Sequence, residues 1–144
     1  MGRPPTPVPQ DVADAIVDWV SNGKTLRDFC RIEGNPAFRT VYDWLEKDKE
    51  FAARFAHARE TGHDVIAEEC LAIMDDGSND WLKTERGLQV NVEAVQRSKL
   101  RVWGRLQLLA KWSPRKYGDA LKLEHSGSID LAGALDAARK RAAE

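Results

Sequence analysis

The chain has 144 residues, of which 42% are hydrophobic and 31% are charged, and its formal net charge is −1. This balance is typical of a folded globular protein rather than a disordered one, and the length allows one modest domain or two small ones. No apolar run approaches the roughly 20 residues of a membrane-spanning helix and no signal peptide opens the chain, so we expect a cytoplasmic protein with no membrane partner.

The N-terminal part begins with an extended arm. Residues 1–9 hold four of the six prolines, and prolines at this density are incompatible with a helix. Helical spacing of apolar residues then predicts a first helix over about 10–22, ended by Gly23. Its inward stripe is predicted to consist of Val12, Ala15, Ile16, Trp19 and Val20.

Two short helices joined by a tight turn follow, which is the pattern of a helix-turn-helix. Thr25 is placed to cap the first of them, and Gly34 is placed to end it. The second covers about 39–47 and begins after an Asn-Pro turn. The predicted inward residues are Leu26, Phe29, Cys30 and Ile32 in the first helix and Val41, Trp44 and Leu45 in the second. We therefore predict a DNA-binding domain over residues 10–60.

The second of these helices is the candidate reader of the major groove. Asp43 and Glu46 also face outward and oppose contact with phosphates, although an acid can accept a hydrogen bond from cytosine. A three-helix bundle that binds no DNA by this face is the alternative. The residues predicted to touch double-stranded DNA are Arg39, Thr40, Tyr42 and Lys47, helped by Arg3, Lys24, Arg27 and Arg31.

The opening Gly-Arg-Pro, which contains Arg3, is typical of arms that insert an arginine into the minor groove. An unstructured terminus is the favoured interpretation of so short a motif.

The central part is predicted to be a helical oligomerisation domain over residues 61–112. Asp48 can cap a long helix over about 49–74, and a polar connection covers 75–91, with Trp81 and Leu82 anchoring it to the fold. A further helix over 92–112 is apolar on more than one side, which predicts a neighbouring subunit as a partner. The predicted subunit contacts are Ile66, Cys70, Ile73, Leu100, Trp103, Leu106 and Trp112.

Positive charge is concentrated in the second half of the chain. Seven Lys and Arg residues and no Asp or Glu lie between residues 96 and 116, whereas residues 1–62 carry nine cations and ten acids. Copies of such a helix would repel one another without an anion nearby. Nucleic acid is one possible counterion; the favoured one is acidic side chains within the assembly, namely Glu68, Glu69, Asp75 and Asp76.

In the C-terminal part, the spacing of apolar residues changes from that of a helix to that of a strand. Residues 113–131 are predicted to form a turn and a short β-hairpin, because apolar and polar residues alternate on either side of a Ser-Gly pair. The apolar hairpin residues are Leu121, Leu123, Ile129 and Leu131. Two strands alone are marginal in water, so pairing with neighbouring chains is expected. The tail over 132–144 is polar and helix-competent, and disorder is the other possibility.

No constellation of residues predicts catalysis. The chain lacks a glycine-rich phosphate loop and a nucleophile elbow. Cys30 and Cys70 are interpreted as reduced thiols, and His57 and His63 as surface histidines. None of the cysteines and histidines, His125 included, has the spacing of a metal site. We therefore expect a protein that is not an enzyme, with no cofactor, metal or small-molecule substrate.

An ordered set of motifs resembles the small terminase subunits of tailed bacteriophages over most of the chain. The set comprises Gly-Arg-Pro at 2–4, Thr-Val-Tyr-Asp-Trp-Leu at 40–45, and the helix over 97–112. The most specific elements follow it: Ser-Pro-Arg-Lys-Tyr-Gly-Asp at 113–119 and Leu-Glu-His-Ser-Gly at 123–127.

The resemblance implies a mainly α protein that assembles into a ring and serves viral DNA packaging. Peripheral helix-turn-helix modules of the family recognise the packaging initiation region, and central helical hairpins build the ring. C-terminal strands can close a small barrel near the large subunit, which carries the ATPase and nuclease and which the small subunit recruits and regulates. Several weak DNA contacts on one ring would gain avidity, so a near-neutral reader is compatible with this role.

Two other classes compete with this interpretation. A dimeric helix-turn-helix transcriptional regulator of prophage origin would use the same N-terminal motif, and oligomer size separates it from a ring. An assembly adaptor whose bundle never touches DNA is the third class. The sequence does not give the number of subunits, the DNA sequence recognised, or the path of DNA relative to the ring.

Overall fold

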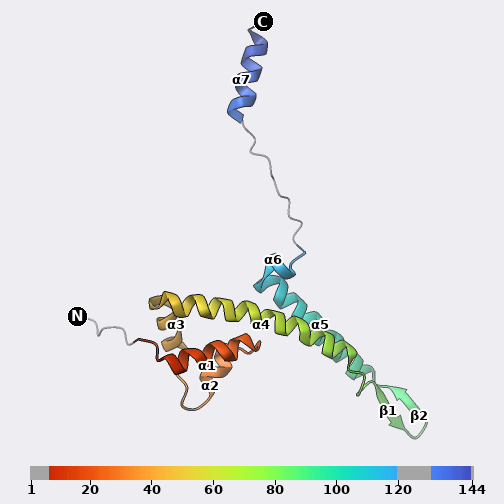
Figure 1. The fold of residues 1–144 in the computed structure, drawn as a ribbon. Helices are drawn as coiled ribbons and strands as arrows, with labels where there is room; N and C mark the ends of the chain where they lie inside the picture. The colour runs from red at the N-terminus through yellow and green to blue at the C-terminus, as the bar shows by residue number, and fades with distance from the viewer. Residues whose placement is uncertain (1–6, 120–130, 144) are drawn as a thin grey trace.

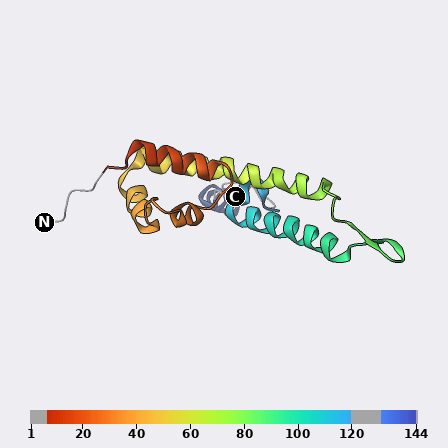
Figure 2. The same ribbon diagram turned by 90° about the horizontal axis from the view of Figure 1, so that it is seen from below.

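The computed structural model describes residues 7–119 and 131–143, and this part of the chain is mainly α-helical, as predicted. An N-terminal bundle lies at one end and a small β-hairpin lies at the other (Figures 1 and 2). The helices of the bundle are α1 (Gln10–Ser21), α2 (Leu26–Arg31), α3 (Phe38–Lys47) and the first half of α4 (Lys49–Asp75). The remaining elements are β1 (Trp81–Thr84), β2 (Gly87–Val90), α5 (Val92–Trp112), α6 (Pro114–Tyr117) and α7 (Leu131–Ala142).

The bundle is organised around a small apolar core. Ile16 of α1 and Val41 of α3 are fully buried, and Phe51 of α4 is nearly so. Ala13 is buried and Ala15 is exposed, so the predicted stripe of α1 is wrong at that position. The face that packs on α4 has the helical spacing 13, 16 and 20 and is rotated slightly from the predicted one.

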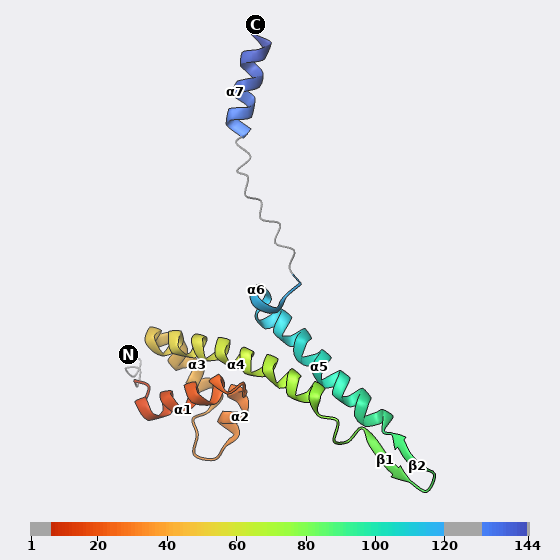
Figure 3. The same ribbon diagram turned by 45° about the vertical axis from the view of Figure 1, so that its right-hand side comes forward.

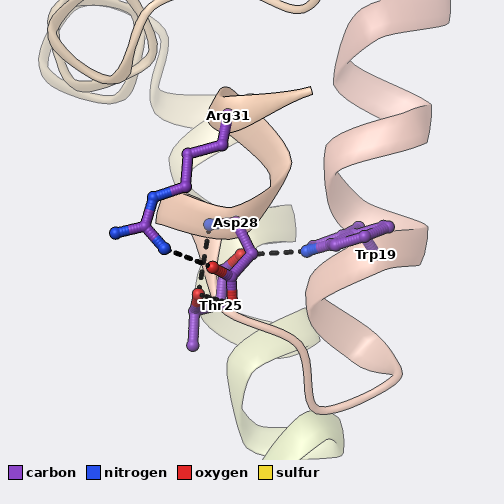
Figure 4. Close-up of polar contacts among 4 residues, drawn as sticks. All are labelled: Trp19, Thr25, Asp28 and Arg31. Atoms are coloured by element: carbon purple, nitrogen blue, oxygen red, sulfur yellow. Dashed lines mark hydrogen bonds and ion pairs between the residues drawn. The ribbon is translucent and has the colours of Figure 1, made fainter. Parts of the chain in front are cut away.

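The turn between α1 and α2 is fixed by hydrogen bonds (Figure 4). Thr25 caps α2 as predicted: its side chain accepts a hydrogen bond from the Asp28 backbone N–H at 3.2 Å. The indole N–H of Trp19 donates to the Thr25 carbonyl at 2.9 Å. Gly23 has a φ of 78°, which favours glycine. The turn therefore ties the start of α2 to the side of α1.

Helix α1 approaches α4 most closely at Gly62. A Cβ atom on this glycine would collide with the carbonyl oxygen of Val20, so no larger residue fits without movement of the backbone. The two helices thus meet backbone to backbone at the middle of α4. This contact joins the N-terminal bundle to the helix that also carries the second half of the molecule.

Helix α5 runs back beside the second half of α4, and the β-hairpin lies beyond their far end (Figure 3). Asp48 caps α4, accepting from the Phe51 backbone N–H at 2.9 Å, and both long helices have nearly the predicted bounds. Within the described part of the chain, Leu109 is the one residue of α5 that is fully enclosed.

The connection between α4 and α5 differs from its prediction as a polar loop. Strands β1 and β2 are antiparallel, with Trp81 opposite Val90 and Lys83 opposite Leu88. Trp81 and Leu82 are 61% and 48% exposed, so the prediction that they anchor the connection to the fold is wrong. The strands contact each other and no other described element.

The predicted hairpin near the C-terminus falls almost wholly outside the described residues. Leu121, Leu123 and Ile129 belong to the stretch that the structure does not describe. Leu131 begins α7 instead of ending a strand, and the predicted polar tail is helical as far as Ala142.

Helix α6 follows the end of α5 (Figures 1 and 3), and two of its side chains bind Asp64 of α4. The Lys116 ammonium lies 2.5 Å from the Asp64 carboxylate, and the Tyr117 hydroxyl donates to the same oxygen. A Cβ atom on Gly118 would lie 2.5 Å from the Pro114 carbonyl oxygen, so this position also requires glycine. The Pro-Arg-Lys-Tyr-Gly motif therefore fixes the place where the chain leaves the end of α5.

Candidate nucleic-acid interface

The turn between α2 and α3 completes a helix-turn-helix. Helix α2 ends at Arg31, three residues before the predicted stop, and Gly34 lies in the turn with a φ of 88°. The side-chain amide of Asn35 donates to the Phe29 carbonyl at 2.8 Å and closes the turn. Ile32 is 45% exposed and does not face inward as predicted.

Helix α3 presents its predicted outward residues on one exposed face. Arg39, Thr40, Tyr42 and Lys47 are all exposed, while Val41 on the opposite side is fully buried. The Tyr42 ring packs on Phe38 with a centroid separation of 4.6 Å. Asp43 and Glu46 are exposed too, so the four charged side chains of this face sum to zero.

The supporting cations around α2 have different surroundings. The Lys24 ammonium lies 4.3 Å from the centre of the Trp19 ring, and the Arg27 guanidinium lies at the same distance from Phe38. Such cation–π contacts position a charge without neutralising it. Arg31 is instead paired with Asp28 at 2.9 Å. Arg3, the remaining predicted contact, lies outside the described residues.

A cleft of about 310 Å³ adjoins this face and extends to the end of α5. Besides residues of α2 and α3, it is lined by Arg59 and His63 of α4 and by Trp112 of α5. Neither Arg59 nor His63 was predicted to belong to a site. The two residues are four positions apart, so they lie on the same face of α4. This spacing could have been noticed in the sequence. Trp112, distant in sequence, could be placed there only by the fold.

His63 is buried, so its interpretation as a surface histidine is wrong. Its side chain stacks on Trp112 with a centroid separation of 5.7 Å. Burial, with a smaller contribution from the nearby Arg59 charge, lowers the pKa of the His63 imidazole. In the described part of the chain, Nδ1 of His63 has no hydrogen-bond partner. Leaving such an atom unsatisfied costs about 1–3 kcal/mol.

The predicted oligomerisation residues divide into two groups. Those of α5 are exposed: Leu100 by 63%, Trp103 by 61%, Leu106 by 47% and Trp112 by 46%. Those of α4 are not: Cys70 is buried, and Ile66 and Ile73 are partly buried. Cys70 thus belongs to the interior of the subunit in this conformation, and the exposed members of the predicted set are those of α5.

Three basic residues of α5 and α6, namely Arg97, Arg105 and Lys116, form ion pairs with acidic side chains among the described residues. Arg105 pairs with Glu69 at 3.2 Å, and Arg97 pairs with Glu93 of its own helix at 3.0 Å. The pKa of Asp76 is lowered, first by hydrogen bonds from Ser78 and last by the charge of Arg101. Glu69 was predicted as a partner for these cations. Part of the positive charge is thus compensated before any assembly.

The structure has two kinds of exposed surface, one on the helix-turn-helix and one on the apolar helix α5. Comparisons with known proteins distinguish a small terminase subunit from a transcriptional regulator. The family model described as "Bacteriophage Sf6, terminase small subunit-like" matches residues 8–124. The chain belongs to this family of phage small terminase subunits. No curated protein matches it.

Three solved structures of the terminase small subunit gp1 of the bacterial virus Sf6 are similar over nearly their whole length. Each is a mutant form of that protein, and each is 33% identical to this chain. Each alignment covers 87% of this chain and 88% of the other, with TM-scores of 0.60, 0.59 and 0.59. Membership of the family confirms the predicted class, a phage small terminase subunit of the DNA-packaging system.

Small terminase subunits are generally non-enzymatic, DNA-binding regulators. No group of three or more metal-ligating side chains occurs in residues 7–119 and 131–143. No described helix is long and apolar enough to cross a membrane.

Proposed function

We propose that this small terminase subunit forms a ring, recognises the packaging initiation region of the viral genome, and recruits and regulates the large terminase subunit. The observation that carries the proposal is the combination of two surfaces on one helix, α4. Its first half packs against a helix-turn-helix whose outward face is exposed, and its second half packs against α5, several of whose apolar side chains are exposed.

DNA recognition is assigned to α3. Arg39 and Lys47 are exposed at the two ends of its outward face, with Thr40 and Tyr42 between them. Because Asp43 and Glu46 cancel the charge of this face, one module would bind weakly. Several modules held on one ring raise the effective concentration of each contact, so weak individual binding is compatible with stable attachment to DNA.

Ring formation is assigned to α5. Leu100, Trp103 and Leu106 follow one another along α5 and are each about half exposed or more, and contiguous exposed apolar side chains favour an interaction surface. Covering this surface against a neighbouring copy removes it from water, which is the main source of association free energy. Recruitment of the large subunit rests on family membership alone.

Native mass spectrometry combined with a gel-shift assay at low salt tests the proposal. We expect a closed oligomer of more than two copies of the 16.2 kDa chain, and salt-sensitive binding of duplex DNA from the packaging region. Arg39→Ala with Lys47→Ala should weaken DNA binding and leave the mass unchanged. A stable dimer would contradict ring formation, and a ring without DNA binding would contradict the assigned recognition of the packaging region.

A further inference from the structure

The cleft between the helix-turn-helix and the end of α5 has the dimensions of a ligand site. Its volume of about 310 Å³ lies at the lower end of the range for small-molecule sites in proteins. Its wall includes the turn after α1, parts of α2, α3 and α4, and Trp112 of α5. Three cations, a buried histidine and several aromatic rings are therefore gathered from parts of the chain up to 88 positions apart, from Lys24 to Trp112.

Among the described residues, the three cations of this cleft, Lys24, Arg27 and Arg59, have no acidic partner. No carboxylate oxygen of residues 7–119 and 131–143 lies within 4.0 Å of their charged groups. Five other cations are paired, namely Arg31, Arg54, Arg97, Arg105 and Lys116. A concave surface with uncompensated positive charge concentrates anions.

His63 contributes a buried imidazole to the wall of the cleft. The residue is 9% exposed and lines the cleft, and its Nδ1 makes no hydrogen bond with any described residue. Two acids influence this imidazole, Glu60 and Asp64. Asp64 is already engaged by Lys116 and Tyr117. Because Nδ1 is shielded from water, His63 shapes the wall of the cleft, and the polar contacts to a ligand fall to the three cations.

The cleft is continuous with the proposed DNA-reading surface. Tyr42 belongs to the outward face of α3 and also lines the cleft. Arg27, held over the Phe38 ring, connects the two along α2. Guanidinium and ammonium groups that converge on one concavity are the groups that bind phosphate oxygens in proteins.

We propose that this cleft binds a phosphoryl group through Lys24, Arg27 and Arg59. A phosphate of the DNA backbone beside α3 is one source of the group, and a free nucleotide is the other. The DNA source rests on the proposed function, whereas binding of a free nucleotide does not. The DNA interface would then extend beyond the helix-turn-helix onto α4.

Fluorescence anisotropy with a labelled duplex from the packaging region tests the DNA source. We expect Arg59→Gln to weaken binding about tenfold, because a charge-assisted hydrogen bond is lost. The slope of log affinity against log salt concentration should become shallower, by the equivalent of about one phosphate contact for each subunit that binds the duplex. Arg59→Lys keeps the charge and should retain most of the affinity. Arg86→Gln, in the exposed turn of the β-hairpin, is the matched control and should bind like the unaltered protein.

Calorimetric titration of the full-length chain with dAMP tests the second source. Binding of dAMP that is lost in both Arg59→Gln and Arg27→Gln, with duplex affinity unchanged, would support the site and assign it to free nucleotides. Native mass and thermal melting of each variant establish that it is folded and assembled. Unchanged affinity of folded Arg59→Gln for both duplex and dAMP would overturn the inference. The proposed function fails separately, if Arg39→Ala with Lys47→Ala leaves duplex binding unchanged.

Discussion

The two halves of this subunit distribute apolar side chains in opposite ways. In the N-terminal bundle, residues of α1, α2 and α3 are enclosed against α4, and Ile16 and Val41 are completely shielded from water. In α5, Leu109 is enclosed while Leu100 and Trp103 remain more than half exposed. The apolar side chains of the bundle are therefore covered within one copy, whereas part of the apolar surface of α5 is left uncovered by a single copy.

Removal of apolar area from α5 should have the largest effect. We expect Trp103→Ala combined with Leu106→Ala to convert the assembly into single chains of 16.2 kDa, while the N-terminal bundle stays folded. Light scattering measures the mass, and circular dichroism measures the helix content. Leu135→Ala, an equally exposed apolar residue of α7, is the control and should leave the mass unchanged. A double variant that keeps the mass of a ring would reject the assignment of α5.

The contact between the two halves is tested at Gly62. Gly62→Ala should destabilise the fold by about 1–3 kcal/mol, because the added methyl group meets the Val20 carbonyl oxygen. Gly104→Ala is the matched control: it is also helical but has nothing within 4 Å, so it should stabilise the chain by about 0.5–1 kcal/mol. Urea denaturation measures both. Equal effects of the two substitutions would contradict the close packing of α1 on α4.

Loss of a helix cap within the bundle should have a smaller effect. Thr25→Ala removes the acceptor for the Asp28 N–H and should cost about 1 kcal/mol. Thr61→Ala removes a hydroxyl that bonds a carbonyl within α4 and should be nearly neutral. Chemical denaturation followed at the tryptophan signal measures both changes. A loss at Thr61 as large as that at Thr25 would argue against the capping role.

The smallest effect is expected at the clip between α6 and α4. Lys116 and then Tyr117 hold the pKa of the Asp64 carboxyl below its usual range, so this group stabilises the fold above that range. The contribution is lost as pH falls through the lowered pKa of Asp64. Asp64 also raises the pKa values of Lys116 and Tyr117, so their part is lost only at high pH. Between pH 7 and pH 3, the melting temperature of Asp64→Asn should therefore fall less than that of the unaltered protein. An unchanged pH profile would contradict the interaction of Asp64 with Lys116 and Tyr117.

The helices could be predicted from the sequence because their ends carry local signals. Thr25 and Asp48 are capping residues whose side chains bind the first turn, and these bonds depend on near neighbours only. The β-hairpin over 81–90 was missed because its strands are four residues long and follow a run of aspartate, serine and glycine that is typical of a loop. The proposed domain boundaries remain predictions.

The candidate site could be predicted where it lies on one element and not where it lies between elements. The outward face of α3 follows from helical spacing around Val41. Arg59 and His63 line the same cleft as Trp112, which the packing of α5 on α4 brings beside them. Periodicity along one helix contains no information about that encounter.

The junction between α3 and α4 consists of the single residue Asp48, whose side chain is bonded to α4. Helix α3 is thus joined directly to the long helix behind it. If the proposed ring forms, a change in the angle at which neighbouring copies pack would turn α4 and, through Asp48, the outward face of α3 with it. The curvature of such a ring and the orientation of α3 would then be coupled.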